Sequence, residues 1–126
     1  MAVISEQSRK KGSILIEIDR GTEYQERFKQ HISTRLAFVE SGKYEEVFGE
    51  RAVQVVYIVV GEKRYRETRR RTMIQWTQEV LQKMELENWG ILFKFTDVGF
   101  EEIFESNLFG GNRWYSPFTK DAGSLF

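Results

Sequence analysis

One run of eight residues constrains the fold of this chain more than any other feature. Residues 53–60 read VQVVYIVV, and every side chain in the run except Gln54 is β-branched or aromatic. A strand with one face in solvent alternates apolar and polar residues, whereas a continuously apolar strand needs cover on both faces. We therefore predict that residues 53–60 form a central strand of a largely parallel sheet, and that Gly61 ends it.

Two other segments have the pattern of strands. Residues 13–19 (SILIEID) carry isoleucine at every second position, and residues 91–96 (ILFKFT) also alternate. A polar stretch, residues 6–12, separates the first of these segments from residues 2–5 (AVIS). Short apolar runs on either side of a polar connection predict an antiparallel β-hairpin.

Helical periodicity lies between the predicted strands. Thr22 is predicted to cap a helix that runs to about residue 40. The apolar stripe of this helix consists of Tyr24, Phe28, Ile32, Leu36 and Val39. A second helix is predicted over residues 62–85, which contain no proline or glycine. Its apolar stripe consists of Met73, Trp76, Val80 and Met84.

The remaining segments of the chain have less regular patterns. Trp89 and Gly90 are predicted to close the second helix, and residues 97–99 to form a turn. Short helical segments are expected at residues 43–48 and 101–107. The tail from Gly110 carries four aromatic residues, which we expect to hold it against the domain. These residues are Trp114, Tyr115, Phe118 and Phe126.

The order of elements is therefore hairpin, helix, strand, helix, strand. Strands that alternate with helices indicate an α/β fold with a largely parallel central part. We predict one domain over residues 1–126, with a central mixed sheet made of the N-terminal hairpin plus parallel strands and flanked by two long helices. A chain of 126 residues and 14.9 kDa has the size of one domain.

Composition excludes several kinds of site. The chain has no cysteine, which excludes disulfides, thiolate metal sites and cysteine catalysis. The single histidine, His31, excludes a zinc site with several histidines from one chain. The longest apolar run, residues 55–60, is far below the roughly 20 residues that span a bilayer. We expect a cytoplasmic protein with no membrane partner and no disulfide partner.

Charge is distributed unevenly along the chain. The net charge is zero, which excludes a globally basic nucleic-acid coat protein. Residues 61–83, however, carry seven bases and three acids, a net charge of +4, and residues 84–126 carry three bases and seven acids, a net charge of −4. Six of the bases lie at the start of the second predicted helix, next to the carboxyl end of a central strand. These bases are Lys63, Arg64, Arg66, Arg69, Arg70 and Arg71.

The basic cluster, defined as these six residues, has two interpretations. Ligands of open α/β sheets usually bind at the carboxyl edge of the strands, and arginines spaced over several helical turns can contact several phosphates. This interpretation predicts a DNA- or phosphate-binding surface. In the alternative, the cluster is a solvated helix face paired with Glu62 and Glu67, or it meets the acidic half of a second copy in a homodimer.

Two carboxylates provide the candidate catalytic and metal site. Glu17 and Asp19 are two residues apart in a predicted strand and therefore share a face at its carboxyl end. Such a pair suits Mg²⁺, which could activate water and polarise a phosphodiester. Lys29 and His31, on the following helix, are the nearest groups for proton transfer or charge stabilisation, and His31 is expected to be partly buried. In the alternative, the carboxylates pair with Arg20 or with an arginine of the basic cluster and organise the strand-to-helix turn.

Residues 16–23 (IEIDRGTE) resemble the most recognisable signature of the replication-relaxation proteins of plasmids and integrative elements. Later features resemble that family in order: Ser41-Gly42 with Tyr44, Phe48-Gly49, the VVYIVV strand with its arginine-rich helix, and Trp114 ahead of Leu125. The resemblance extends over residues 2–125. Only the IEIDRGTE segment is specific to the family.

The resemblance implies a DNA-associated protein of plasmid replication, in a family implicated in the relaxation of supercoiled DNA. Its members join a winged-helix-like segment to a C-terminal domain similar to the restriction-endonuclease-like (PD-(D/E)xK) nucleases. Glu17 would match the acid of the second nuclease motif, and Asp19 stands where an active nuclease has lysine. The Pro-Asp pair of the first motif would lie upstream of Ala2, so the chain resembles a small derivative of that C-terminal domain.

Three hypotheses for function follow. The first is a DNA-associated domain of a bacterial mobile-element replication or relaxation protein that binds DNA phosphates without cleavage by itself. The second is a non-enzymatic module for protein interaction or dimerisation. The third is a Mg²⁺-dependent endonuclease or nickase that uses Glu17 and Asp19. No cofactor other than Mg²⁺ is implied.

Overall fold

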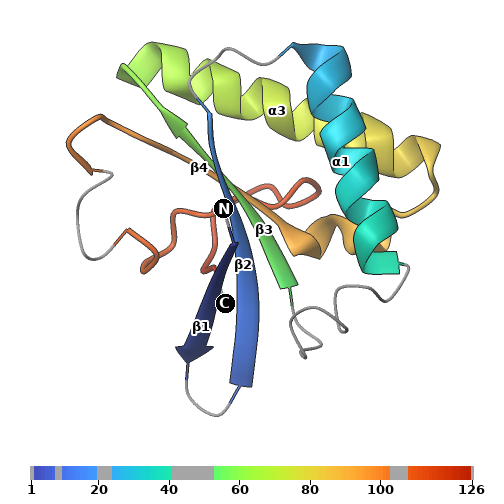
Figure 1. Cartoon of the computed structure of the whole chain (residues 1–126). Coiled ribbons are helices and arrows are strands. Elements are labelled where there is room, and N and C mark those ends of the chain that lie inside the picture. The colour runs from blue at the N-terminus through green and yellow to red at the C-terminus, as the bar shows by residue number, and fades with distance from the viewer. Residues whose placement is uncertain (1, 8–9, 20–23, 41–52, 103–107, 126) are drawn as a thin grey trace.

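The computed structural model describes residues 2–7, 10–19, 24–40, 53–102 and 108–125. Four strands form one mixed sheet in the order β1-β2-β3-β4 (Figure 1). Their bounds are β1 (Ala2–Gln7), β2 (Lys10–Asp19), β3 (Val53–Val60) and β4 (Phe93–Val98). β1 pairs with β2 antiparallel, and β2, β3 and β4 are parallel. The predicted α/β class, with an N-terminal hairpin beside parallel strands, is confirmed.

The hairpin strands are longer than the alternation in the sequence predicts. Ala2 pairs with Leu15 and Ile4 with Ser13, which is the predicted antiparallel arrangement. The ladder continues to the Gln7–Lys10 pair, so most of the polar stretch predicted as a connection belongs to the strands. Backbone pairing does not require apolar side chains, and hydrophobic patterning therefore underestimated the length of the strands.

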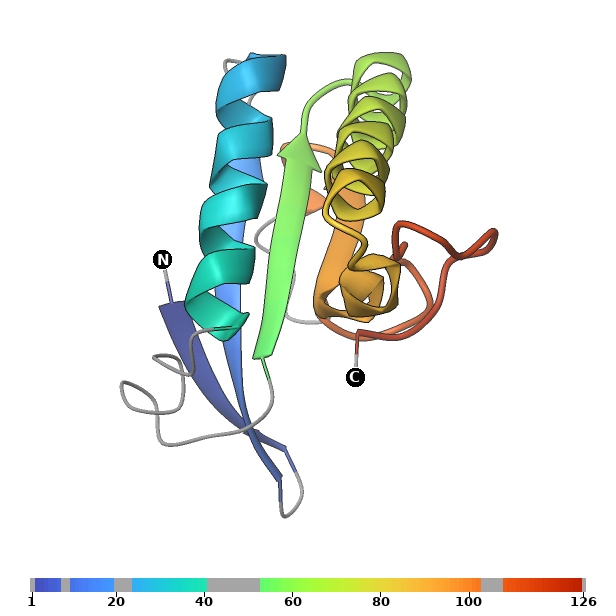
Figure 2. The ribbon, with the colours of Figure 1, turned by 90° about the vertical axis from the view of Figure 1, so that its right-hand side faces the viewer.

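Two helices, α1 (Gln25–Glu40) and α3 (Lys63–Lys83), lie side by side over one face of the sheet (Figure 2). The chain order explains this arrangement. The helices follow β2 and β3, and the sheet adds β3 and then β4 in the same direction. Crossovers between parallel strands have one preferred hand, so two successive crossovers in the same direction place their helices on the same face.

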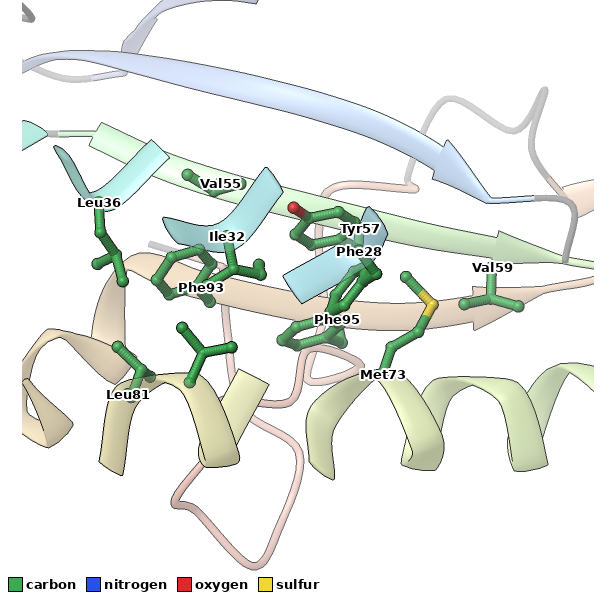
Figure 3. Packing of buried hydrophobic residues seen from close by; sticks show 11 residues of the cluster. Phe28, Ile32, Leu36, Val55, Tyr57, Val59, Met73, Leu81, Phe93 and Phe95 are labelled. Atoms are coloured by element: carbon green, nitrogen blue, oxygen red, sulfur yellow. The ribbon is translucent and has the colours of Figure 1, made fainter. Parts of the chain in front are cut away.

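The main core fills the space between these helices and the sheet (Figure 3). From α1 it takes Phe28, Ile32 and Leu36, which are at most 1% exposed, as their spacing predicts. Tyr24 was assigned to the same stripe, and this was wrong because its side chain is 82% exposed. The helix begins one residue later, at Gln25, so Tyr24 lies beyond the packed turns.

The apolar stripe of α3 is confirmed in its middle and wrong at its end. Met73 and Val80 are buried, as predicted, and Trp76 packs against the core. Met84 is 38% exposed, because α3 ends at Lys83. Buried Leu81 takes its place in the core, at a position that the predicted spacing passed over.

The connection from α3 to β4 also differs from the prediction. A 3₁₀ helix, η1 (Glu87–Leu92), contains Trp89 and Gly90 and begins a new element, so these residues do not close α3. Ile91 is therefore 68% exposed, and β4 starts at Phe93. The strand continues through Asp97 to Val98, where a turn was predicted. Apolar residues at positions 91–92 extended the strand pattern in the sequence, but the backbone there is helical.

The opposite face of β3 packs against the C-terminal segment. Val56, Ile58 and Val60 form a second cluster there with Leu108, Trp114 and Leu125, all at most 7% exposed. Tyr115 forms an antiparallel bridge with Phe95, which fixes the segment along β4. The predicted cover on both faces of residues 53–60 is confirmed, as is the anchoring of the tail through Trp114. Phe118 is 43% exposed, so not every aromatic side chain of the tail is an anchor.

Some predictions fall on residues 41–52, 103–107 or 126, or on Thr22, all outside the described residues. They concern the cap of the first helix, the short segment at 43–48, most of the short helix at 101–107, and Phe126. Among the described residues, no helix has both the length and the apolar composition needed to cross a membrane.

Candidate nucleic-acid interface

Glu17 and Asp19 point from β2 toward the helices. Their neighbours on β3 are Tyr57 and Val59, whose side chains belong to the main core. The predicted shared face is therefore confirmed, and it is the face covered by α1 and α3. The acidic pair lies at the carboxyl end of the strand, as expected from the sequence.

An arginine pairs with each of these carboxylates. Arg35 of α1 donates to Glu17 Oε1. Arg69 of α3 donates to both oxygens of Asp19, from Nε at 2.9 Å and from Nη2 at 3.0 Å. Asp19 is only 7% exposed, so the pair with Arg69 is shielded from water. Pairing with an arginine of the basic cluster is the alternative left open by the sequence, and the structure shows it for Asp19.

These contacts do not fit a Mg²⁺ site at Glu17 and Asp19. Arg69 donates to both oxygens of Asp19 and balances its charge, so a Mg²⁺ ion at Asp19 would be repelled by this guanidinium or would have to displace it. Within the described part of the chain, no three potential metal ligands gather in one place. Lys29 pairs with Glu79 of α3, with 2.9 Å between Nζ and Oε2. His31 was expected to be partly buried and is instead exposed.

The basic cluster divides into an inner and an outer half. The side chains of the inner half, Arg66, Arg69 and Arg70, are only 18%, 12% and 10% exposed. Arg66 Nε donates to Asp97 Oδ1 at 3.0 Å, and Arg70 Nε donates to Asp97 Oδ2. Arg66 also donates to the Gly61 carbonyl oxygen at 3.2 Å. Asp97 thus bridges two guanidinium groups at the end of β4.

Aromatic rings support two of the inner arginines. The guanidinium carbon of Arg69 lies 5.2 Å from the centre of the Trp76 ring, and that of Arg70 lies 4.0 Å from the centre of the Tyr115 ring. Both distances are within the range of cation–π attraction. Its ion pair with Asp19 lets Arg69 join α3 to β2, and the contacts of Arg70 with Asp97 and Tyr115 join α3 to β4 and the C-terminal segment. The inner half of the cluster therefore holds α3 in place over the strand ends.

Helical phase explains this division. Arg66, Arg69 and Arg70 precede Met73 by seven, four and three residues, which places them on the core-facing side of α3. Arg64 and Arg71 have other phases, and Lys63 shares the phase of Arg66 and Arg70 but is the first residue of α3; all three are exposed. The exposed outer half of the cluster is therefore available to a ligand from solution, and Arg70 of the inner half also lines an open groove.

A stripe of polar side chains runs along α3 directly opposite its buried side. We call it the outward face. Its members follow one another at spacings of three or four residues, so they form one row along the helix. They are Arg64, Thr68, Arg71, Gln75, Gln78 and Gln82. All are exposed except Gln78, which is half-buried. The arginines and glutamines have side-chain N–H groups that can donate hydrogen bonds, whereas the hydroxyl of Thr68 donates to the Arg64 carbonyl oxygen at 3.1 Å.

A groove borders the outward face. It has a volume of about 610 Å³ and lies between α3 and residues 115–120. Gln78 donates to the carbonyl oxygen of Pro117 and closes one part of it. No aspartate or glutamate occurs among the described residues that line the groove, whereas three cations do: Arg70, Arg71 and Lys120. The groove lining and the outward face are rich in donors and include no carboxylate, while Glu67 and Glu79 flank the row at helical spacing.

Several residues of this region were not predicted from the sequence. Asp97 continues the alternation of Phe93 and Phe95, which is the signal that it faces the helices. Lys120 had no such signal, because the fold of the tail brings it to α3. Arg35 and Glu79 were likewise recognised only through their partners.

Comparisons with known protein families, with curated proteins and with solved structures find no match for this chain.

Proposed function

We propose that this chain binds DNA through the phosphate backbone, using the outward face of α3 and the groove beside it, and that it does not cleave DNA by itself. The observation that carries the proposal is the row of hydrogen-bond donors on α3, from Arg64 to Gln82, which contains no carboxylate. The resemblance of residues 16–23 to the replication-relaxation proteins supports DNA as the partner and a mobile-element replication protein as the context. As this resemblance implies, we also propose that the fold is restriction-endonuclease-like.

The physical basis is electrostatic and local. Each phosphate neutralised by a lysine or arginine releases condensed counterions, which favours binding at low salt. Uncharged donors such as Gln75 and Gln82 add hydrogen bonds to phosphate or sugar oxygens. The zero net charge of the chain does not oppose this, because repulsion from acids elsewhere falls off over about 10 Å at ordinary ionic strength.

The proposal assigns separate roles to the two halves of the basic cluster. Lys63, Arg64 and Arg71 contact phosphates, since they are exposed. Arg66 and Arg69 position the helix, since their guanidinium groups are held by Asp97 and Asp19. Binding through all six bases, as predicted from the sequence, would require breaking these inner ion pairs.

The decisive experiment measures DNA affinity against salt concentration. Fluorescence anisotropy of a labelled duplex gives the slope of log K against log salt for the native protein and for the Arg64→Ala/Arg71→Ala variant. Each lost phosphate contact lowers the slope by about 0.9, so we expect a decrease of nearly 2 together with weaker binding. The matched control is Arg27→Ala/Lys83→Ala, which removes the same charge at exposed positions outside the outward face.

The outcomes separate a localised site from general attraction. Loss of affinity in the outward-face variant and near-native affinity in the control supports the proposal. Equal losses in both variants would show that the duplex senses only overall charge. No salt-dependent binding by the native protein would refute the proposal.

Association between two copies is a second candidate, favoured by the charge separation along the chain. The exposed bases of α3 could meet exposed acids of a second molecule. Those acids are Glu85, Glu87, Glu101 and Asp121. Mass measured by light scattering over a range of concentrations tests this candidate. A dimer at low salt that dissociates at high salt would support it, and a monomer at all concentrations would exclude it.

A further inference from the structure

Arg70 differs from the other inner arginines in the use of its donors. Its side chain is nine-tenths buried, and Nε donates to Asp97 Oδ2. Its planar group lies over the ring of Tyr115, and the residue lines the groove. Among the described residues, no acceptor binds its two Nη groups. Arg69, by contrast, places both Nε and Nη2 on Asp19.

The two Nη groups are not closed off from solvent, because Arg70 lines the groove, so a bound anion can replace water as their acceptor. A groove that contains such a guanidinium is therefore suited to a ligand that supplies acceptors. The guanidinium fork matches the oxygen spacing of carboxylate and phosphate, and the ring of Tyr115 fixes its plane. Arg70 is thus held in position for an anion before the anion binds.

Other groups lining the groove are compatible with an anion. Arg71 and Lys120 are exposed cations on its two sides, one on α3 and one on the C-terminal segment. The hydroxyl of Ser116 accepts a hydrogen bond from Lys94 Nζ at 2.7 Å, which leaves the Ser116 proton available for donation. Thr119 Oγ1 accepts from the Ser116 backbone N–H at 3.2 Å and fixes the turn that carries this hydroxyl.

We propose that the groove is a seat for one phosphate group, bound by the guanidinium of Arg70 together with Arg71 and Lys120. This inference deepens the proposed function and rests on it for the source of the phosphate, which is the backbone of the bound DNA strand. A free phosphate compound has the same chemistry, and a groove of about 610 Å³ is large enough for one. The experiment therefore includes an arm that distinguishes the two sources.

The first arm uses inorganic phosphate as the probe. Phosphate replaces chloride at constant ionic strength, while two-dimensional NMR follows the Nε–H signal of Arg70 and the backbone amides of Arg71 and Thr119. The seat predicts saturating shifts with one phosphate per protein. Shifts that grow linearly without saturation, or shifts spread over the whole surface, would overturn the inference.

Variants locate the bound phosphate. Arg71→Ala/Lys120→Ala changes only exposed side chains, so the fold is retained, and we expect phosphate affinity to fall at least about tenfold. Arg70→Lys keeps the charge but loses the planar fork, and we expect a similar decrease. The control, Arg27→Ala/Lys83→Ala, should bind phosphate as the native protein does. Unchanged affinity in Arg71→Ala/Lys120→Ala would overturn the inference even if Arg70→Lys failed to fold.

The second arm adds a duplex to the phosphate-saturated protein. Competition between the two supports the DNA backbone as the source of the phosphate. Saturable phosphate binding without DNA binding would assign the seat to a free phosphate compound and refute the proposed function. DNA binding without saturable phosphate binding would overturn the seat and leave the proposed function intact, so the two failures are distinguishable.

Discussion

The ion pairs at the end of β4 lead to a direct prediction about stability. Replacement of Asp97 by alanine removes the carboxylate that accepts from both Arg66 and Arg70. These arginine side chains are only 18% and 10% exposed, so water replaces the lost acceptor poorly. The substitution therefore leaves two poorly solvated positive charges beneath α3.

The size of the effect follows from the contacts that remain. Removal of one partner of a buried ion pair costs about 3–5 kcal/mol. Arg66 still reaches the Gly61 carbonyl oxygen and lies 3.6 Å from Glu102, and Arg70 keeps the ring of Tyr115. We therefore expect a loss at the lower end of this range, a decrease of about 3 kcal/mol in the free energy of unfolding. For a chain of 126 residues, about 1 kcal/mol corresponds to roughly 4 °C, so Tm falls by about 12 °C.

Circular dichroism during thermal and urea denaturation measures both quantities. Asp121→Ala is the matched control, since it removes the same group from an exposed position. We expect the control to remain within about 0.5 kcal/mol of the native protein. A loss below about 0.5 kcal/mol for Asp97→Ala would show that the inner arginines do not depend on this carboxylate and would refute the structural role assigned to them.

Three further predictions concern other sites. Gly111 has a φ of 75°, so Gly111→Ala should lower the free energy of unfolding by about 1 kcal/mol in the same denaturation assay. Gly123→Ala should be nearly neutral, because a Cβ atom at this position meets no atom within 4 Å. Burial lowers the pKa of Lys94 below its usual value of 10.5. Between the folded and the unfolded pKa the unfolded chain therefore binds more protons, so the stability of the native protein relative to Lys94→Met should rise as pH increases toward 10.5. Because arginines hold Glu17 and Asp19, supercoiled plasmid should stay intact with the native protein and Mg²⁺ or Mn²⁺; nicking that is abolished by Glu17→Ala would contradict this expectation.

Hydrophobic patterning predicted the elements better than their ends. Continuous apolar residues in β3 and the spacing of Phe28, Ile32 and Leu36 in α1 indicated burial that the structure confirms. Tyr24 and Ile91 carry the same kind of pattern but lie where the backbone begins or changes an element, and both are exposed. An apolar side chain is buried only if its neighbours along the chain adopt the geometry that turns it inward, and local sequence constrains that geometry least at the ends of elements.

The candidate site could be predicted in part. The position of the basic cluster next to a strand end is confirmed, and the phase of its arginines relative to Met73 indicates that three of the five face inward. The partners were not predictable in this way, because Asp19 lies 50 residues from Arg69 and Asp97 lies 31 residues from Arg66. Such pairs depend on strand order and helix packing, which local periodicity does not specify.

The most direct test of the proposed function maps the contact surface on the protein. Amide NMR signals recorded while a DNA duplex is added at low salt should shift most along the outward face of α3, at Arg64, Thr68, Arg71 and Gln75. Signals of α1 around His31 should remain in place. Shifts centred on α1, or no shifts at protein and DNA concentrations that give binding in other assays, would contradict the account of α3 as the DNA-binding element.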